Sequence, residues 1–332
     1  MASVDPGEAP AHQLPRVLMP FAPAEVGGLP ATWDALYWDG RDDPPDAAAL
    51  RAVEFFVFPY GFHAAALPML SRLPRLRVVQ SLSAGVDDLL AELPEGVTLC
   101  NARGVHDAST AELAVALVLA ALRGIPGFVR DQRARLWCEG FRPALAGRTV
   151  LLVGYGSIGA AVDERLAPFE CRVLRVARSA RDTARGPVHA LERLPALLPE
   201  ADVVVLTLPL TADSRGMVDA AFLARMRDAA LLVNVARGPI VDTRALLTEL
   251  HSGRLCAALD VTDPEPLPPD HALWSAPNTL ISPHAGGSSS AFLPRARALV
   301  QQQLAAFVAG MPLANIVAGP DRTGNPGGRK QR

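Results

Sequence analysis

The stretch LLVGYGSIGAAVDERL (Leu151 to Leu166) decides the fold of this chain. It is an apolar run that is interrupted by Gly154, Gly156 and Gly159 and then continues with helical spacing. A strand, a tight turn and a helix start in this order are typical of a place where a nucleotide pyrophosphate rests on a helix N-terminus, because free N–H groups and the helix dipole favour negative charge there. A single G-x-G-x-x-G can be merely a turn, so the interpretation depends on the surrounding strands.

Six apolar runs, most of them separated by helical patterns, predict a parallel sheet around these glycines. They are Arg148 to Gly156, Cys171 to Arg178, Ala201 to Pro209, Ala230 to Gly238, Cys256 to Val261 and Asn278 to His284. A complete dinucleotide-binding sheet requires about six parallel strands. Dinucleotide binding is therefore the better interpretation of the glycine turn.

The first hundred residues predict a second α/β unit. Its strands are expected at Arg16 to Pro20, Ala35 to Asp39, Glu54 to Tyr60, Leu76 to Gly85 and Val97 to Ala102. A long helix should follow, with Ser109 or Thr110 as its N-cap. Near the end of the chain we expect a helix that starts or is interrupted at Pro294, and then a disordered tail over 319–332.

Composition excludes several classes of function. The chain has 332 residues, half of them apolar, and a formal net charge of -2, which indicates neither a nucleic-acid nor a membrane partner. No secretion signal is recognisable, and four cysteines without C-x-x-C spacing suit a reducing cytoplasm and predict no metal site. The only lysine is Lys330, so pyridoxal, P-loop and short-chain dehydrogenase chemistry, which need a lysine in the folded body, are not expected.

The end of the second strand of the glycine-turn sheet normally carries an acid that binds the adenosine ribose. Ala177 occupies that place here, and Arg178 and Ser179 follow it. A carboxylate would repel a 2′-phosphate, whereas an arginine can hold one. The sequence therefore predicts that NADP(H) is preferred and NAD(H) possible, with the alternative that Arg178 and Arg181 are ordinary surface arginines.

Three polar segments follow the last strands of the same sheet. NVARG contains Arg237, DVTDPEP contains Glu265 and SPHAGG contains His284. Ligands bind outside the carboxyl ends of strands in open α/β sheets, so these side chains can converge above a cofactor. Taken singly, each could instead be a surface or structural residue.

Taken together, GYGSIG, NVARG, DVTDPEPL and SPHAGG resemble the D-2-hydroxyacid dehydrogenase family in order and spacing, and the resemblance extends from SLSAGVDDL (Ser81 to Leu90) to His284. It implies an α/β fold of two domains, with a doubly wound Rossmann sheet inserted into a flavodoxin-like substrate domain. The expected NAD(P)-binding domain spans 103–284. The expected substrate domain spans 1–102 and 285–318.

The resemblance also implies roles for individual residues. Arg237 would bind the substrate carboxylate and polarise the C2 carbonyl, and His284 would be the proton donor or acceptor. Glu265 would pair with His284 and favour its protonated form. The implied substrate contacts are Tyr60, Gly61, Ser83, Ala84, Gly85, Arg237 and His284. The implied cofactor contacts are Gly154, Gly156, Ser157, Ile158, Gly159, Arg178, Ser179, Thr207, Pro209, Val235, Ala236, Asp260, His284 and Gly286.

The expected activity is hydride transfer between NADP(H) and C2 of a small 2-keto or 2-hydroxy acid, as in glyoxylate and hydroxypyruvate reductases. A phosphite-type dehydrogenase of the same family and a cofactor-sensing, corepressor-like protein are the alternatives. A homodimer is expected through the helix from Ala111 to Leu122 and the following GFVRDQRARLW segment, although both could be core instead. Three positions depart from the family pattern: Ala177 stands in place of an acid, and Asp163 and Glu170 stand where the family tends to have small residues.

Overall fold

The computed structural model describes residues 16–27 and 33–320, which form two compact units. The first unit comprises Met1–Val105 and Leu293–Arg332, and the second comprises His106–Phe292. The boundaries lie three and eight residues later than the expected 102 and 284. The expected tail over 319–332 falls outside the described residues except for its first two.

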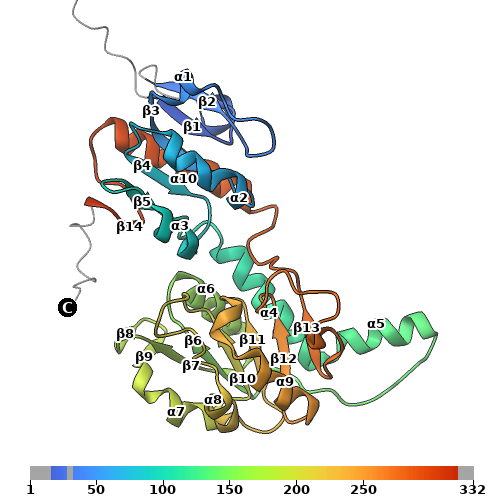
Figure 1. Ribbon diagram of the computed structural model, residues 1–332. Coiled ribbons are helices and arrows are strands. Elements are labelled where there is room, and N and C mark those ends of the chain that lie inside the picture. Colours follow the sequence, from blue (N-terminus) through green and yellow to red (C-terminus); the bar gives the residue numbers. More distant parts are fainter. Residues whose placement is uncertain (1–15, 28–32, 321–332) are drawn as a thin grey trace, which may run out of the picture. The chain divides into compact units, whose positions relative to one another are not determined.

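A six-stranded sheet organises the first unit, in the order β14-β5-β4-β3-β1-β2 (Figure 1). The five predicted strands are present as β1 (Arg16–Met19), β2 (Asp34–Tyr37), β3 (Val53–Phe58), β4 (Val78–Ser81) and β5 (Thr98–Cys100), and they pair in parallel. The sequence interpretation missed β14 (Ile316–Ala318), which runs antiparallel to β5. The helices of this unit are α1 (Ala47–Leu50), α2 (His63–Ala66), α3 (Asp87–Glu92) and α10 (Phe292–Val308).

The core of the first unit is built on β3. Phe55, Phe56 and Phe58 are fully buried, because apolar elements cover both faces of a parallel sheet. Phe55 lies 5.5 Å from the ring of Phe307 in α10, while Phe56 stacks on Trp38. The helix near the end of the chain therefore completes the core that the N-terminal strands begin.

An eight-stranded sheet forms the second unit, in the order β13-β12-β11-β10-β6-β7-β9-β8. The six predicted strands are present as β6 (Thr149–Val153), β7 (Arg172–Ala177), β10 (Val203–Leu206), β11 (Leu231–Asn234), β12 (Cys256–Leu259) and β13 (Thr279–Ile281), all parallel. Two strands were not predicted: β9 (Gly186–Ala190) extends the sheet beside β7, and β8 (Arg181–Thr183) pairs with β9 as an antiparallel hairpin. Helices α4 and α6 to α9 flank the sheet, whereas α5 extends away from it (Figure 1). The bounds of α4 to α9 are Asp107–Arg123, Ile125–Ala134, Ser157–Leu166, Leu194–Leu197, Ala220–Arg225 and Thr243–His251.

The predicted N-cap of α4 was wrong. The helix begins at Asp107 with His106 as its N-cap residue, so Ser109 and Thr110 are buried inside the first turns. The hydroxyl of Ser289 donates a hydrogen bond to Ser109 Oγ at 2.9 Å. Asp107 in the first turn supplies the negative charge that a helix N-terminus favours.

Among the described residues, no single helix has the length and apolar character needed to cross a membrane. Helices α4 and α5 reach that length only as a pair, and they are bent by 60° relative to each other.

Candidate active site

The three glycines that follow β6 are glycine for different structural reasons: Gly154 and Gly156 lie between β6 and α6, and Gly159 lies in the first turn of α6. A Cβ at Gly154, whose φ is +100°, would lie 2.6 Å from the backbone N of Leu208, and a Cβ at Gly159 would lie 2.3 Å from the carbonyl oxygen of Gly154. Both must be glycine for the strand, turn and helix to pack. A Cβ at Gly156 would have nothing described within 4 Å of it. The space beside Gly156 is therefore open to a ligand that approaches the backbone closely.

The start of α6 suits a phosphate. Gly156 is its N-cap residue and provides no side-chain cap, so the first-turn N–H groups are available to an anion. Thr207 Oγ1 donates a hydrogen bond to the Gly154 carbonyl and holds the turn, and Ser157 Oγ lies 3.1 Å from Asp107 Oδ1. Ile158 is half-buried and Pro209 is exposed. These residues fit the pyrophosphate of a dinucleotide.

The end of β7 carries no carboxylate. Ala177 is half-buried, and Arg178 and Ser179 are exposed directly after it. Within the described part of the chain, Arg178 makes no hydrogen bond or ion pair. Arg181, which the alternative interpretation took as an ordinary surface arginine, is exposed but also donates a hydrogen bond to the Tyr155 carbonyl in the glycine turn.

Arg237 is positioned by a buried asparagine that the sequence interpretation missed. Asn234, at the end of β11, donates from Nδ2 to the Arg237 carbonyl at 2.9 Å and accepts at Oδ1 from the Ala236 N–H at 3.0 Å. Val235 and Ala236 are buried. A Cβ at Gly238 would lie 1.8 Å from the Thr262 carbonyl oxygen, so the turn packs tightly against the loop after β12.

The structure brings Glu265 and His284 together. Glu265 Oε1 lies 2.5 Å from His284 Nδ1, and both side chains are more than a third exposed. Burial raises the pKa of Glu265, but the hydrogen bond and charge of His284, a backbone hydrogen bond from Thr262 and the charge of Arg237 outweigh it and lower this pKa. Glu265 is therefore ionised at neutral pH, and His284 Nε2 is the ring nitrogen left for a ligand.

His284 has a φ of +51°, which is unusual for a residue other than glycine. Asp260, at the end of β12, holds this loop. Its carbonyl accepts from the His284 N–H at 2.7 Å, and its buried carboxylate accepts from the N–H groups of Ala285 and Gly286 at 2.8 and 2.9 Å and from Ser282 Oγ at 2.6 Å. Three of about four acceptor positions of the carboxylate are thus used inside the loop.

These groups share one edge of the sheet. Because β6, β7, β10, β11, β12 and β13 are parallel, the glycine turn, Arg178, Arg237, Asp260 and His284 all follow the carboxyl ends of their strands. This is the edge where open α/β sheets bind ligands. Within the described residues, no group of histidine, cysteine and acidic side chains could hold a metal ion.

The predicted substrate contacts of the first unit lie at the corresponding edge of its own sheet. Tyr60 and Gly61 follow β3, and Ser83, Ala84 and Gly85 follow its parallel neighbour β4. The Ser83 N–H donates to Ser81 Oγ at 3.0 Å, and Asn101 Nδ2 donates to the Ala84 carbonyl at 2.8 Å. These bonds give the loop after β4 a defined backbone.

Comparisons with known proteins agree with this geometry. Residues 115–286 match the family model of the D-isomer specific 2-hydroxyacid dehydrogenase, NAD binding domain. A glyoxylate reductase from Aeropyrum pernix is 32% identical over 300 residues, which cover 86% of this chain and 90% of that protein.

Two solved structures are also similar. A D-isomer specific 2-hydroxyacid dehydrogenase family protein from Aeromonas salmonicida has a TM-score of 0.81 and 30% identity, covering 91% of this chain and 98% of that one. An NADPH-dependent glyoxylate/hydroxypyruvate reductase from Sinorhizobium meliloti, in complex with NADP and sulfate, has a TM-score of 0.79 and 29% identity, covering 92% and 99%. The chain therefore belongs to the D-isomer-specific 2-hydroxyacid dehydrogenases, a family of NAD(P)-dependent oxidoreductases that act on CH–OH groups.

Proposed function

We propose that this protein is an NADPH-dependent reductase of small 2-keto acids, with glyoxylate and hydroxypyruvate as the nearest substrates. The observation that carries the proposal is the 2.5 Å contact between Glu265 and His284 at the sheet edge that also bears Arg237 and the glycine turn. An ionised carboxylate on Nδ1 stabilises the imidazolium, which can then deliver a proton from Nε2.

The reaction divides between the cofactor and the side chains. When bound, a nicotinamide cofactor would supply the hydride that adds to C2. Arg237 binds the substrate carboxylate and polarises the C2 carbonyl, and His284 Nε2 donates a proton to the carbonyl oxygen. In the direction of oxidation, His284 takes this proton back. Asp260 holds the His284 loop, and the remaining acceptor position of its carboxylate would serve the nicotinamide amide.

The remaining proposed substrate contacts are taken over residue by residue from the family resemblance. The backbone N–H groups of Ser83, Ala84 and Gly85 are assigned to a carboxylate oxygen of the substrate, and Tyr60 and Gly61 to its side chain. These assignments rest on the family resemblance and on the positions of both loops at strand ends.

The preference for NADPH rests on the end of β7. The missing carboxylate at Ala177 removes a repulsive charge. Arg178, which is exposed and has no partner among the described residues, and the hydroxyl of Ser179 supply donors for a 2′-phosphate. The similar reductase from Sinorhizobium meliloti is described as NADPH-dependent and was solved with NADP. Gly154, Gly156, Ser157, Ile158, Gly159, Thr207, Pro209, Val235, Ala236 and Gly286 are assigned to the rest of the cofactor.

The test is an activity panel with purified protein. Glyoxylate, hydroxypyruvate and pyruvate are each offered with NADPH and with NADH, and phosphite is offered with NADP⁺ and NAD⁺, while the nicotinamide absorbance is followed. Reduction of the 2-keto acids with a higher kcat/KM for NADPH supports the proposal. Turnover of phosphite alone, or a preference for NADH, contradicts it.

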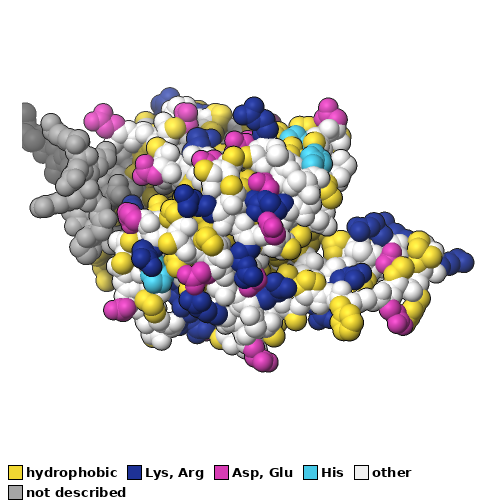
Figure 2. All heavy atoms as spheres, turned by 90° about the horizontal axis from the view of Figure 1, so that it is seen from below, with side chains coloured by type: hydrophobic (Ala, Val, Ile, Leu, Met, Phe, Trp, Pro, Cys, Tyr) yellow, Lys and Arg dark blue, Asp and Glu magenta, His cyan; other side chains and the backbone are white. Residues whose placement is uncertain are grey.

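We also infer a homodimer, through α5 and the segment that follows it. The helix from Ala111 to Leu122, which was expected to take part, packs its apolar face into the core of the second unit instead. Helix α5 and the segment after it extend away from the sheet of the second unit in Figure 1, and the same extension carries hydrophobic side chains in Figure 2. Its exposed apolar residues are Ile125, Phe128, Val129, Leu136, Trp137 and Phe141, and Trp137 is 90% exposed. Exposed apolar side chains gathered on one segment mark an interaction surface. A second copy of the chain is the proposed partner.

A further inference from the structure

A buried acid in the middle of α6 is not used by the proposed mechanism. The side chain of Asp163 is 1% exposed, on the face of the helix that packs inside the second unit. A buried carboxylate is costly unless it is paired and hydrogen-bonded. Asp163 is also one of the positions at which the sequence departs from the family pattern, so its partners identify a feature of this particular chain.

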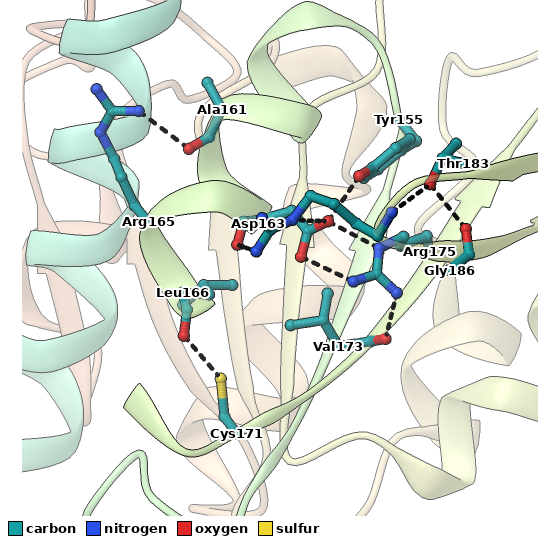
Figure 3. A network of polar contacts seen from close by, with 11 residues as sticks. Tyr155, Ala161, Asp163, Arg165, Leu166, Cys171, Val173, Arg175, Thr183 and Gly186 are labelled. Atoms are coloured by element: carbon teal, nitrogen blue, oxygen red, sulfur yellow. Dashed lines mark hydrogen bonds and ion pairs between the residues drawn. The ribbon is translucent and has the colours of Figure 1, made fainter. Parts of the chain in front are cut away.

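Asp163 is fully satisfied by three side chains. Oδ2 accepts from Tyr155 Oη at 2.6 Å, from Arg175 Nε at 2.8 Å and from Arg185 Nε at 3.0 Å, while Oδ1 accepts from Arg175 Nη2 at 2.9 Å. Arg185 also donates to the Asp163 carbonyl at 3.0 Å. Figure 3 shows the Arg175 guanidinium and the Tyr155 hydroxyl converging on Asp163.

The charge state of Asp163 follows from these contacts. Burial raises its pKa, but the hydrogen bonds from Arg175 and Tyr155 and the charges of Arg175 and Arg185 outweigh burial, and the pKa is lowered. Burial and the hydrogen bond to Asp163 raise the pKa of Tyr155, which therefore keeps its proton and donates it. The cluster is a stable ionic centre at neutral pH.

The three partners come from the elements that surround the expected position of the adenosine ribose. Tyr155 lies in the glycine turn, Arg175 lies on β7, and Arg185 lies in the turn between β8 and β9. A dinucleotide places this ribose between the glycine turn and the end of the second strand, which is β7 here. Asp163 therefore connects both sides of the ribose position to the hairpin.

The hairpin is attached at two points. At one end, Arg185 binds Asp163, and the local turn is closed by Thr183 Oγ1, which donates to the Gly186 carbonyl at 2.7 Å. At the other end, Arg181 donates to the Tyr155 carbonyl, and its guanidinium lies 5.8 Å from the Tyr155 ring centroid. Only residues 178–180 separate the end of β7 from the start of β8. Arg178 and Ser179 are thus on a short connection that is held at both ends.

We propose that Asp163 is a positioning residue for cofactor selection: through Arg185 it fixes the β8–β9 hairpin against α6 and thereby presents Arg178 and Ser179 to the 2′-phosphate of NADPH. The inference rests on the proposed NADPH preference. Without the bond from Arg185 to Asp163, Arg178 and Ser179 are still present, but the hairpin keeps only its attachment through Arg181 and is less ordered. Phosphate binding must then order the connection. This cost affects only ligands that carry the 2′-phosphate.

The decisive variant is Arg185→Ala, because Asp163 keeps the bonds from Arg175 and Tyr155 and no bare carboxylate remains in the core. Arg185→Lys keeps a positive charge near Asp163 and should retain part of the 2′-phosphate affinity that Arg185→Ala loses. Arg172→Ala is the matched control, since Arg172 lies on the same β7, at its far end, and makes an exposed ion pair with Glu200 at 3.0 Å.

The direct readout is calorimetric binding of adenosine 2′,5′-bisphosphate and of 5′-AMP, with KM for NADPH and NADH and with Tm measured alongside. We expect Arg185→Ala to weaken the bisphosphate about three- to tenfold, the scale of ordering one or two side chains. Binding of 5′-AMP, KM for NADH and kcat at saturating cofactor should not change. Arg172→Ala should change none of these.

The outcomes separate this inference from the proposed function. If the wild-type protein binds both nucleotides equally and Arg178→Ala has no effect, the NADPH proposal and this inference both fail. If Arg178→Ala weakens the bisphosphate but Arg185→Ala does not, the inference alone fails. Equal weakening of both nucleotides by Arg185→Ala also overturns it, because the bond from Arg185 to Asp163 would then support the fold and not selectivity.

Discussion

Arg178→Ala is the substitution that tests cofactor preference most sharply. In the structure Arg178 is exposed and has no described partner, so its removal breaks no contact of the fold. A hydrogen bond to a charged group contributes about 1.5–3 kcal/mol, which corresponds to roughly ten- to a hundred-fold in affinity. Solvent screening at an exposed side chain favours the lower end of this range, so we expect about a tenfold rise in KM for NADPH.

The assay is kcat/KM for both cofactors on the wild type, Arg178→Ala and Ala177→Asp. KM for NADH should stay constant in Arg178→Ala, because NADH has no 2′-phosphate. Ala177→Asp should shift the cofactor preference further toward NADH, since the carboxylate repels the 2′-phosphate of NADPH and accepts a hydrogen bond from the ribose hydroxyl of NADH. A wild type that already prefers NADH, or an equal loss with both cofactors in Arg178→Ala, refutes the reasoning and makes Arg178 a surface residue.

Three further predictions follow from the site and from α5. Glu265→Gln removes the anion beside His284, so the alkaline limb of the reduction profile should move to lower pH. The pKa of Glu265 is lowered from its ordinary value of 4.5 in the folded protein, so the ionised carboxylate stabilises the fold above that pH. As the pH falls below 4.5 and through the lower folded pKa, the wild type should lose more Tm than this variant, and identical profiles would contradict the pairing. Asp260→Asn places an amide N–H against the N–H of Ala285 or of Gly286, whichever way the amide is turned. Tm should therefore fall by an amount equivalent to about 1–3 kcal/mol, and kcat should fall as well. Unchanged Tm and kcat would show that Asp260 does not support the loop. A double change of Phe128 and Trp137 to serine should convert a dimer into a monomer in sedimentation, and a wild type that already sediments as a monomer contradicts the dimer.

Much of the fold was predictable because the strands are continuous apolar runs. β6, β10 and β11 are buried on both faces, and their sequences show this directly. Glu265 and His284 stood out by their positions after strands, and the family resemblance implied that they pair. In the structure Glu265 Oε1 lies 2.5 Å from His284 Nδ1.

The remaining features depend on contacts between residues that are distant in sequence. β8 has the sequence Arg-Asp-Thr, which contains no apolar residue from which a strand could be predicted. It is stabilised by pairing with β9 and by the hydrogen bond from Arg181 to the glycine turn. In the sequence, Asp163 is a charged residue where a small one is expected, and only the fold brings Arg175 and Arg185 into contact with it. Asn234 is a partial exception, since a lone amide at the end of an apolar strand is a detectable signal.

The central claim is that His284 is the proton donor of a reductase, and His284→Ala tests it most directly. Two quantities are measured: kcat for glyoxylate reduction at saturating NADPH, and the Kd for NADPH by fluorescence titration. General acid catalysis is worth about 10²–10⁴ in rate, so kcat should fall by that factor while the Kd stays nearly unchanged. A variant with near-normal kcat, or one whose loss of activity is explained by loss of NADPH binding, contradicts the account.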